Sequence, residues 1–140
     1  MARERMIEKW KYSIFWKRSN QFIESMRENL ERKRNMPCVS DAAICTIASV
    51  DTLAVYLIGK KSSAQSHQEA AFILKEIKTS DDAERNRIGN LLTDLLEIKA
   101  IAQYEDQEPS WSDTEKAARS CEKIFKFVEN ELRKAGASLE

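Results

Sequence analysis

Glycine, proline and histidine are scarce in this chain of 140 residues, which holds three Gly, two Pro and one His. Tight turns depend on Gly and Pro, and an all-β fold needs many such turns. The scarcity therefore argues against an all-β fold. A metal site would need further ligands near this single histidine, but the chain has no second His and no Cys or Asp at a spacing typical of metal ligands. We therefore expect no metal site and no cofactor.

Cysteine is also rare, and its pattern is uninformative for binding. Cys38, Cys45 and Cys121 are odd in number and contain no Cys-x-x-Cys spacing. This argues against a disulfide framework and favours a reducing compartment. Cys45 and Cys121 fall at apolar positions of predicted helices, where we expect small buried thiols.

A long uninterrupted apolar run is missing as well. The first residues are highly charged, which argues against a signal peptide. Segment 42–58 is the most apolar, but it contains Asp51 with several Thr and Ser, and we interpret it as too short and too polar to span a bilayer. We expect a cytoplasmic protein with no membrane partner. Leu139–Glu140 is interpreted as a cloning remnant, which leaves one domain over residues 1–138.

Charge of either sign is not in excess, since 23 Lys and Arg balance 23 Asp and Glu. This balance argues against coating nucleic acid by bulk charge. The charge is uneven, however: residues 1–36 hold ten basic and five acidic residues, a net charge of +5, and residues 37–140 carry the opposite net charge. The basic segment could steer an anionic partner, or it could dock on an acidic surface of this chain or of a dimer mate.

Helical periodicity dominates what is present. Apolar residues recur at three- and four-residue steps through most of the chain. Helices are predicted over about residues 3–34, 40–59, 66–77, 82–103 and 112–135. Short connections make neighbouring helices antiparallel. The predicted fold class is all-α, an antiparallel up-down bundle of four long helices with one short helix between the second and the fourth.

The predicted helix ends depend on capping residues. Pro37 is expected to end the first helix, because the residue before proline avoids the α region. Gly59 and Gly136 lie where C-terminal caps are expected. The predicted N-terminal caps are Ser40 or Asp41, the capping box Ser66–Glu69, and the capping box Ser112–Glu115.

Two tryptophans lie among the lysines of the first predicted helix. Trp10 is placed on its apolar face with Ile14, and Trp16 follows six residues later. Aromatic side chains interleaved with basic ones can stack on nucleic-acid bases. They can also be core residues or anchors of a dimer interface, which is the interpretation we favour.

Four segments, taken in order, resemble the helices of the HEPN-domain family. They cover roughly residues 38–133 and are residues 40–59, 66–77, 95–105 and 112–128. The resemblance implies an antiparallel, HEPN-like bundle that forms homodimers. Many family members are metal-independent ribonucleases, often toxins paired with a small nucleotidyltransferase. Their signature is an Arg followed, after four to six residues, by a His in a cleft between subunits, where the His acts as base and the Arg holds the phosphate.

This sequence departs from that signature. Lys99 stands at the Arg position, and Tyr104, Glu105 and Asp106 occupy the region of the His. Lys lacks the bidentate fork of Arg, and an unperturbed Tyr with a pKa of about 10 is a poor base at neutral pH. We therefore predict a degenerate site. Weak catalytic candidates are Lys99, Tyr104 and His67. Alternatively, Lys99 is a solvated lysine, Tyr104 is a packed tyrosine at a helix end, and His67 is a surface residue in the first turn of a helix.

Candidate ligand-binding residues are Lys99, Tyr104, Asp51 and Arg87. Asp51 lies within an apolar stripe, where a carboxylate must be paired or protonated. It is either beside Lys99 or Arg87 in an inter-subunit cleft, or in a structural ion pair or edge position. Arg87 either contacts phosphate or keeps a helix end in water.

The predicted function is a dimeric, HEPN-like binding or interaction module for a partner protein or a nucleotide-bearing ligand. A nucleotidyltransferase-type protein, RNA and free nucleotide are the partners that the resemblance implies. The alternative is a metal-independent HEPN-type endoribonuclease, the toxin of a toxin–antitoxin pair. No Gly-rich phosphate loop or nucleophile elbow supports another class of enzyme.

Overall fold

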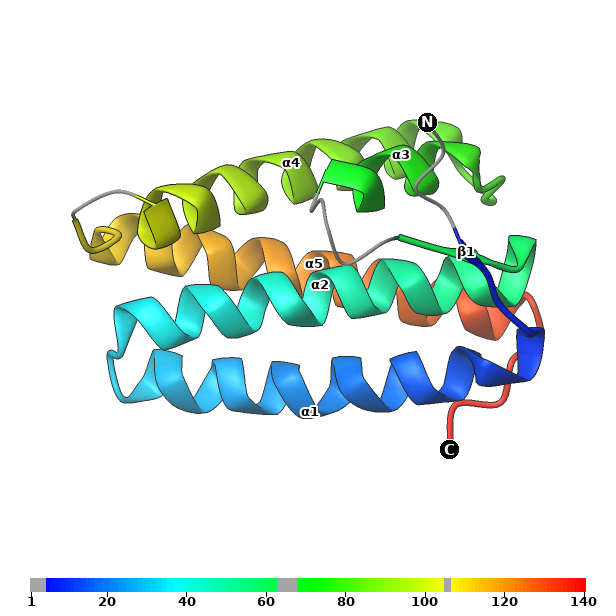
Figure 1. The fold of residues 1–140 in the computed structure, drawn as a ribbon, viewed down its shortest axis with the longest axis horizontal. Coiled ribbons are helices and arrows are strands. Elements are labelled where there is room, and N and C mark those ends of the chain that lie inside the picture. The colour runs from blue at the N-terminus through cyan, green and yellow to red at the C-terminus, as the bar shows by residue number, and fades with distance from the viewer. Residues whose placement is uncertain (1–4, 63–67, 105–106) are drawn as a thin grey trace.

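The structure is a computed structural model, and it describes residues 5–62, 68–104 and 107–140. Four long helices form an antiparallel up-down bundle (Figure 1). A short helix, residues 68–76, lies beside the long helix that follows it in the sequence, residues 82–104. This confirms the predicted all-α bundle. The elements are β1 (Arg5–Met6), the 3-10 helix η1 (Lys9–Lys11), α1 (Tyr12–Glu31), α2 (Asn35–Ile58), β2 (Lys60–Lys61), α3 (Gln68–Glu76), α4 (Asp82–Tyr104) and α5 (Trp111–Lys134).

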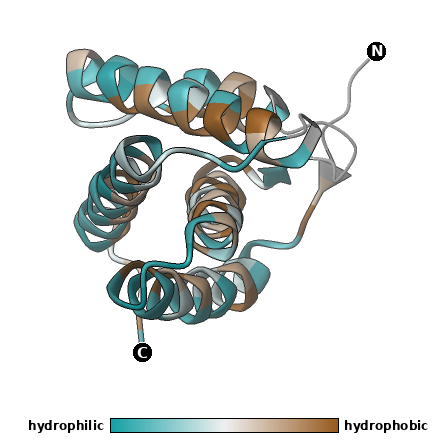
Figure 2. Ribbon diagram, turned by 90° about the vertical axis from the view of Figure 1, so that its left-hand side faces the viewer, coloured by the Kyte–Doolittle hydropathy of each residue, from teal (hydrophilic) through white to brown (hydrophobic). Residues whose placement is uncertain are grey.

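Helix α2 forms the centre of the bundle. It contacts α1, α4 and α5, and apolar residues face the space between the helices (Figure 2). Because it begins at Asn35 rather than near Ser40, α2 has 24 residues and is long and apolar enough to cross a bilayer by length and composition. The expectation that this region is too short was therefore wrong. In the bundle, 67% of its most apolar window is buried, so the core accounts for its apolar character.

The N-terminal segment differs from the predicted helix. Instead of a helix from about residue 3, β1 pairs antiparallel with β2, so that Met6 lies opposite Lys60. The Ile7 N–H donates to the Gly59 carbonyl at 2.8 Å. Gly59 has a φ of 68°, a left-handed conformation that suits glycine, and it ends α2 as predicted.

The junction between α1 and α2 also differs from the prediction. Helix α1 ends at Glu31, and Lys33, with a φ of 56°, makes the turn. Helix α2 then begins before Pro37, which lies in its first turn. Proline is tolerated there because the first N–H groups of a helix have no intrahelical partner.

The last helix starts two residues earlier than predicted. Ser110, not Ser112, is the N-cap of α5, and its Oγ accepts a hydrogen bond from the Asp113 N–H at 3.0 Å. Gly136, with a φ of 86°, follows the end of α5 as expected. The other predicted capping box begins at Ser66, which lies outside the described residues.

The core contains all three cysteines as free, buried thiols, which confirms the predicted burial of Cys45 and Cys121. Trp16 is also buried and stacks on Phe125 of α5, with ring centroids 4.8 Å apart. Trp10, in contrast, is 62% exposed on η1, so its placement on the apolar face was wrong.

Candidate functional site

Lys99 lies in a small pocket where the end of α4 meets the start of α2. The pocket has a volume of about 300 Å³. It exists because α2 begins early enough to bring its first turn against α4. Its lining residues are Met36, Pro37, Val39, Ser40, Lys99, Ala102 and Gln103.

The Lys99 pocket is mostly apolar. Partial burial there lowers the pKa of the Lys99 ammonium group, because desolvation penalises its charged form. Ser40 and Gln103 are the polar residues that share the lining. No described residue of this pocket is a carboxylate, a histidine or a second cation, so the pocket as described lacks a base for RNA cleavage.

The other two weak catalytic candidates cannot be placed beside Lys99. Tyr104 is the last residue of α4, but its side chain lies outside the described residues. His67 also lies outside them. Of the three weak catalytic candidates, the structure therefore describes the side chain of Lys99 alone.

Asp51 serves the local structure of the chain at the opposite end of α2. It is 4% exposed, and its Oδ1 accepts hydrogen bonds from the Ser62 N–H and the Ser62 hydroxyl, both at 2.9 Å. Burial raises the pKa of Asp51, although the bonds from Ser62 and the charges of Lys61 and Arg18 act in the opposite direction. Asp51 therefore holds the segment that leaves β2 against α2.

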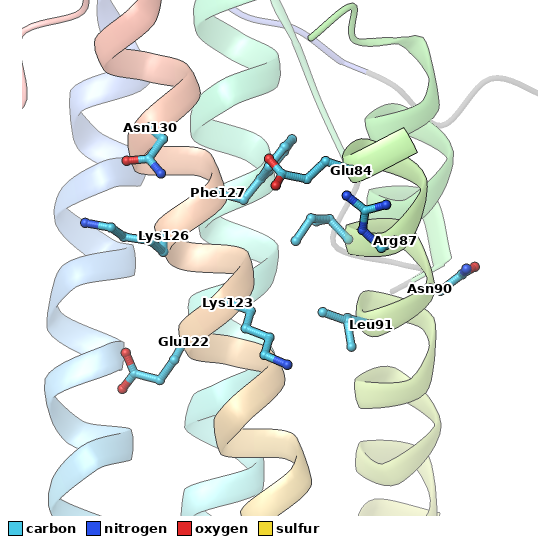
Figure 3. A pocket seen from close by; sticks show the side chains of 10 residues that line it. Glu84, Arg87, Asn90, Leu91, Glu122, Lys123, Lys126, Phe127 and Asn130 are labelled. Carbon is cyan, nitrogen blue, oxygen red and sulfur yellow. The ribbon is translucent and has the colours of Figure 1, made fainter. Parts of the chain in front are cut away.

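A wide groove lies between α4 and α5, and we call it the α4–α5 groove. Its volume is about 780 Å³. Ile88, Leu91 and Phe127 supply apolar surface, and Phe127 and Leu91 point into the groove (Figure 3). Such a volume is typical of sites for small molecules, which span about 300–1,000 Å³.

Charged side chains stand on both walls of the α4–α5 groove. Arg87 and Glu84 extend from α4, and Lys123 extends from α5 toward α4 (Figure 3). Among the described residues, neither Arg87 nor Lys123 has an ion-pair or hydrogen-bonding partner. Two cations with an apolar floor between them can bind an anion that also carries an apolar group.

The neighbouring charges on α5 are already neutralised. Glu122 is turned away from α4 and accepts two hydrogen bonds from Arg27 of α1, at 2.7 and 2.8 Å. This hydrogen bonding raises the pKa of Arg27. Lys126 lies 3.5 Å from Glu129 on its own helix. Lys123 is therefore the cation of α5 that the groove can use.

The sequence-predicted ligand residues do not form one site within the protomer. Lys99 and Arg87 are 12 residues apart on α4, which separates them by about 18 Å along the helix. Asp51 lies 11 residues beyond Ser40 of the Lys99 pocket, or about 16 Å along α2. Arg87 belongs to the α4–α5 groove, Lys99 to its own pocket, and Asp51 to neither.

Sequence reasoning missed the α5 side of the groove. Lys123 and Phe127 are spaced i, i+4 and so share a face of α5. That spacing was available, but nothing in one sequence tells that this face meets Arg87 and Leu91 of α4. Among the described residues, no group of three or more His, Cys, Asp or Glu could hold a metal ion.

A family model for the HEPN domain matches residues 12–131. The match begins at the first residue of α1 and includes all four long helices up to the last turn of α5. Comparison with curated proteins and with solved structures gives no match.

Proposed function

The chain belongs to the HEPN-domain family, and from this premise we propose that it is a homodimeric binding module that takes a nucleotide-bearing ligand in its α4–α5 groove. The observation that carries the proposal is that two cations, Arg87 and Lys123, stand on opposite walls of a groove with an apolar floor. The predicted family resemblance is confirmed by the family match. The ligand and the dimer are our proposal.

The chemistry of the groove suits the parts of a nucleotide. A phosphate between Arg87 and Lys123 would receive charge-assisted hydrogen bonds, which are stronger than neutral ones. The face of a base could lie on the apolar floor. Glu84, on the same wall as Arg87, could accept a hydrogen bond from a ribose hydroxyl or an exocyclic amino group.

Binding fits this chain better than RNA cleavage. Cleavage beside a 2′-hydroxyl needs a base that removes its proton and a cation that holds the phosphate. The family motif supplies both, whereas Lys99 lies in an apolar pocket whose described lining contains no base. Endoribonuclease activity is therefore the alternative that the experiment below must exclude.

Homodimerisation has support in the surface beside Lys99. Met36, which lines the Lys99 pocket, is 50% exposed, and Ile101, at the same end of α4 but about 200° around the helix from Lys99, is 41% exposed. Large apolar side chains that stay in water in one protomer can be buried by a second one. A second copy over this end would enclose Lys99 between subunits, where the family places its motif.

The test of ligand binding is calorimetric titration of the full chain with AMP and with ATP. We expect saturable binding that Arg87→Gln and Lys123→Gln each weaken by about tenfold or more, since a hydrogen bond to a charged group is worth about 1.5–3 kcal/mol. Lys116→Gln is the matched control, because Lys116 is an exposed lysine of α5 outside the groove.

Two results would overturn the proposal. The first is the absence of binding of either nucleotide, or binding that the two groove variants leave at wild-type strength. The second is cleavage of a single-stranded RNA by the wild-type chain that Lys99→Ala abolishes, because this would favour the endoribonuclease.

A further inference from the structure

Helix α3 packs beside α4 (Figure 1), and a third, smaller cavity lies between these two helices. We call it the α3–α4 cavity; its volume is about 240 Å³. It is more enclosed than the α4–α5 groove. The lining of the cavity includes polar side chains and one glycine: Lys75 of α3 and Arg85, Asn86, Gly89, Asn90 and Thr93 of α4.

The lining follows from helical spacing. Arg85, Gly89 and Thr93 lie at four-residue steps and so share one face of α4, while Asn86 and Asn90 form the adjacent row. None of the residues that line the cavity is a carboxylate. The cavity therefore presents two cations and two amides as donors, while the Thr93 hydroxyl already donates to the Gly89 carbonyl at 3.0 Å.

Arg85 is only partly satisfied by the protein. Its Nη1 donates to the Ile77 carbonyl at 2.8 Å and lies 3.4 Å from Asp82. Its Nε is buried and has no hydrogen-bond partner among the described residues. Buried polar atoms in folded proteins nearly always have partners, so an unpartnered donor that belongs to a cavity-lining residue points to an acceptor supplied by a ligand.

Lys75 brings the second positive charge from α3. Among the described residues it has no ion pair, and it lies over the ring of Phe72, with its Nζ 5.7 Å from the ring centroid. An anion in the cavity would be attracted by Lys75 and by Arg85, whose ion-pair partner Asp82 does not line the cavity. The nearby Glu76 is paired instead with Lys60, at 3.4 Å, and does not line the cavity.

Gly89 keeps the cavity open. A Cβ built there would meet one neighbour, the Leu74 Cδ2 at 3.9 Å, which is an ordinary contact. Packing therefore does not require glycine at this position. Glycine in a helix interior is unfavourable relative to alanine, so its presence beside a polar cavity is consistent with space being kept for a ligand.

We propose that the α3–α4 cavity binds a compact oxyanion of the phosphate class, held by Lys75 and Arg85. The volume lies below the range of about 300–1,000 Å³ in which drug-sized ligands bind, so a whole nucleotide is too large. The α3–α4 cavity shares the lining residue Asn90 with the α4–α5 groove, but it lies on the α3 side of α4 and uses different cations. The inference therefore stands independently of the proposed nucleotide site.

The test is a titration of the ¹⁵N-labelled full chain with inorganic phosphate, against sodium chloride at equal ionic strength and pH. We expect saturable shifts of backbone amides around Gly89 and Thr93 with phosphate only. Lys75→Gln should weaken this binding by about tenfold, and Gly89→Met, which fills the cavity, should abolish it. Lys116→Gln, at an exposed lysine of α5 that lines neither site, is the control and should leave it unchanged.

Arg85→Gln would also remove the bond to Ile77, so the exposed Lys75 and the sterically tolerant Gly89 carry the test. Equal shifts with phosphate and chloride would overturn the proposal. So would wild-type phosphate affinity in both Lys75→Gln and Gly89→Met. Loss of the phosphate response in Lys123→Gln, with Lys75→Gln unaffected, would assign the anion to the α4–α5 groove and also overturn it.

Discussion

At the scale of single residues, Trp10 and Trp16 show how far two neighbours of one type can differ. Trp16 is buried and stacks on Phe125 of α5, whereas Trp10 is exposed, and its indole N–H donates to Glu8 at 2.6 Å. Burial of a large aromatic ring stabilises a fold, while an exposed ring contributes little. The stability of the bundle should therefore depend on one tryptophan and not on the other.

We predict that Trp16→Ala lowers the free energy of unfolding by about 3–5 kcal/mol, because it leaves a cavity beside Phe125. Trp10→Ala should change it by only about 0.5 kcal/mol or less. Urea unfolding followed by far-UV circular dichroism measures both. Equal losses in the two variants would contradict the described position of the N-terminal segment.

A second residue-scale prediction concerns Asp51 and pH. Burial raises its pKa in the folded state, so between its ordinary value of about 3.9 and the raised value the folded chain binds more protons than the unfolded chain. The contribution of Asp51 to stability is then largest below the ordinary pKa and falls as pH rises through the folded pKa. Asp51→Asn removes this dependence and keeps an oxygen acceptor for Ser62.

We therefore expect Asp51→Asn to be at least as stable as the wild type at pH 7. Its advantage should shrink as the pH falls toward 4, where Asp51 becomes neutral too. The free energy of unfolding of each protein is measured across this pH range. The difference between the two proteins reports Asp51 alone, because all other carboxylates are present in both. Asp51→Ala, which leaves the Ser62 donors unpaired, should lose about 1–3 kcal/mol. A gap between wild type and Asp51→Asn that widens on acidification would contradict the account.

Residue-level roles were the least predictable part of the sequence. The apolar stripe correctly indicated that Asp51 is buried, but its partner Ser62 lies 11 residues away, beyond the end of α2. Helical periodicity extends no further than the helix itself. It could not distinguish a carboxylate that holds a local segment from one that faces a ligand.

At the scale of the elements, the helices were predicted well and their ends less well. Periodicity located all five α-helices, since each long helix buries an apolar face. Pro37 was wrongly taken as a terminator because proline is unfavourable inside a helix but acceptable in its first turn. Residues 5–6 form a strand rather than a helix, because they pair with β2. The prediction missed this strand because its partner lies more than 50 residues away in the sequence.

The start of α5 provides the prediction at this scale. Ser110→Ala should cost about 1 kcal/mol, because it removes the acceptor for the Asp113 N–H, whereas Ser112→Ala should have a far smaller effect. Thermal or urea unfolding of the two variants compares the two serines directly. A larger loss for Ser112→Ala would restore the capping box that the sequence suggested.

At the scale of the whole molecule, the bundle was predictable and the site was not. Short connections and amphipathic helices leave few topologies besides an up-down bundle. Which face of one helix meets which face of another depends on long-range packing. The sequence named Arg87 as a candidate, but it did not indicate Lys123 and Phe127 of α5, which line the same groove.

The proposed homodimer gives a prediction at the same scale. Ile101→Lys places a charge on exposed apolar surface at the end of α4 that carries Lys99, and it should weaken self-association by about tenfold or more. Phe72→Lys is the matched control, because Phe72 is 65% exposed on α3, away from that end. Light scattering after size exclusion, over a range of protein concentrations, measures the oligomeric state. A monomeric wild type, or dissociation by Phe72→Lys alone, would count against the proposed interface.

We propose that this HEPN domain binds a nucleotide between α4 and α5 instead of at the position of the family's ribonuclease motif. The most direct measurement is a titration of the ¹⁵N-labelled chain with AMP, with the shifted amides mapped on the structure. We expect the largest shifts around four residues of the groove, Arg87, Leu91, Lys123 and Phe127. Shifts gathered around Lys99, or no saturable shifts at all, would contradict it.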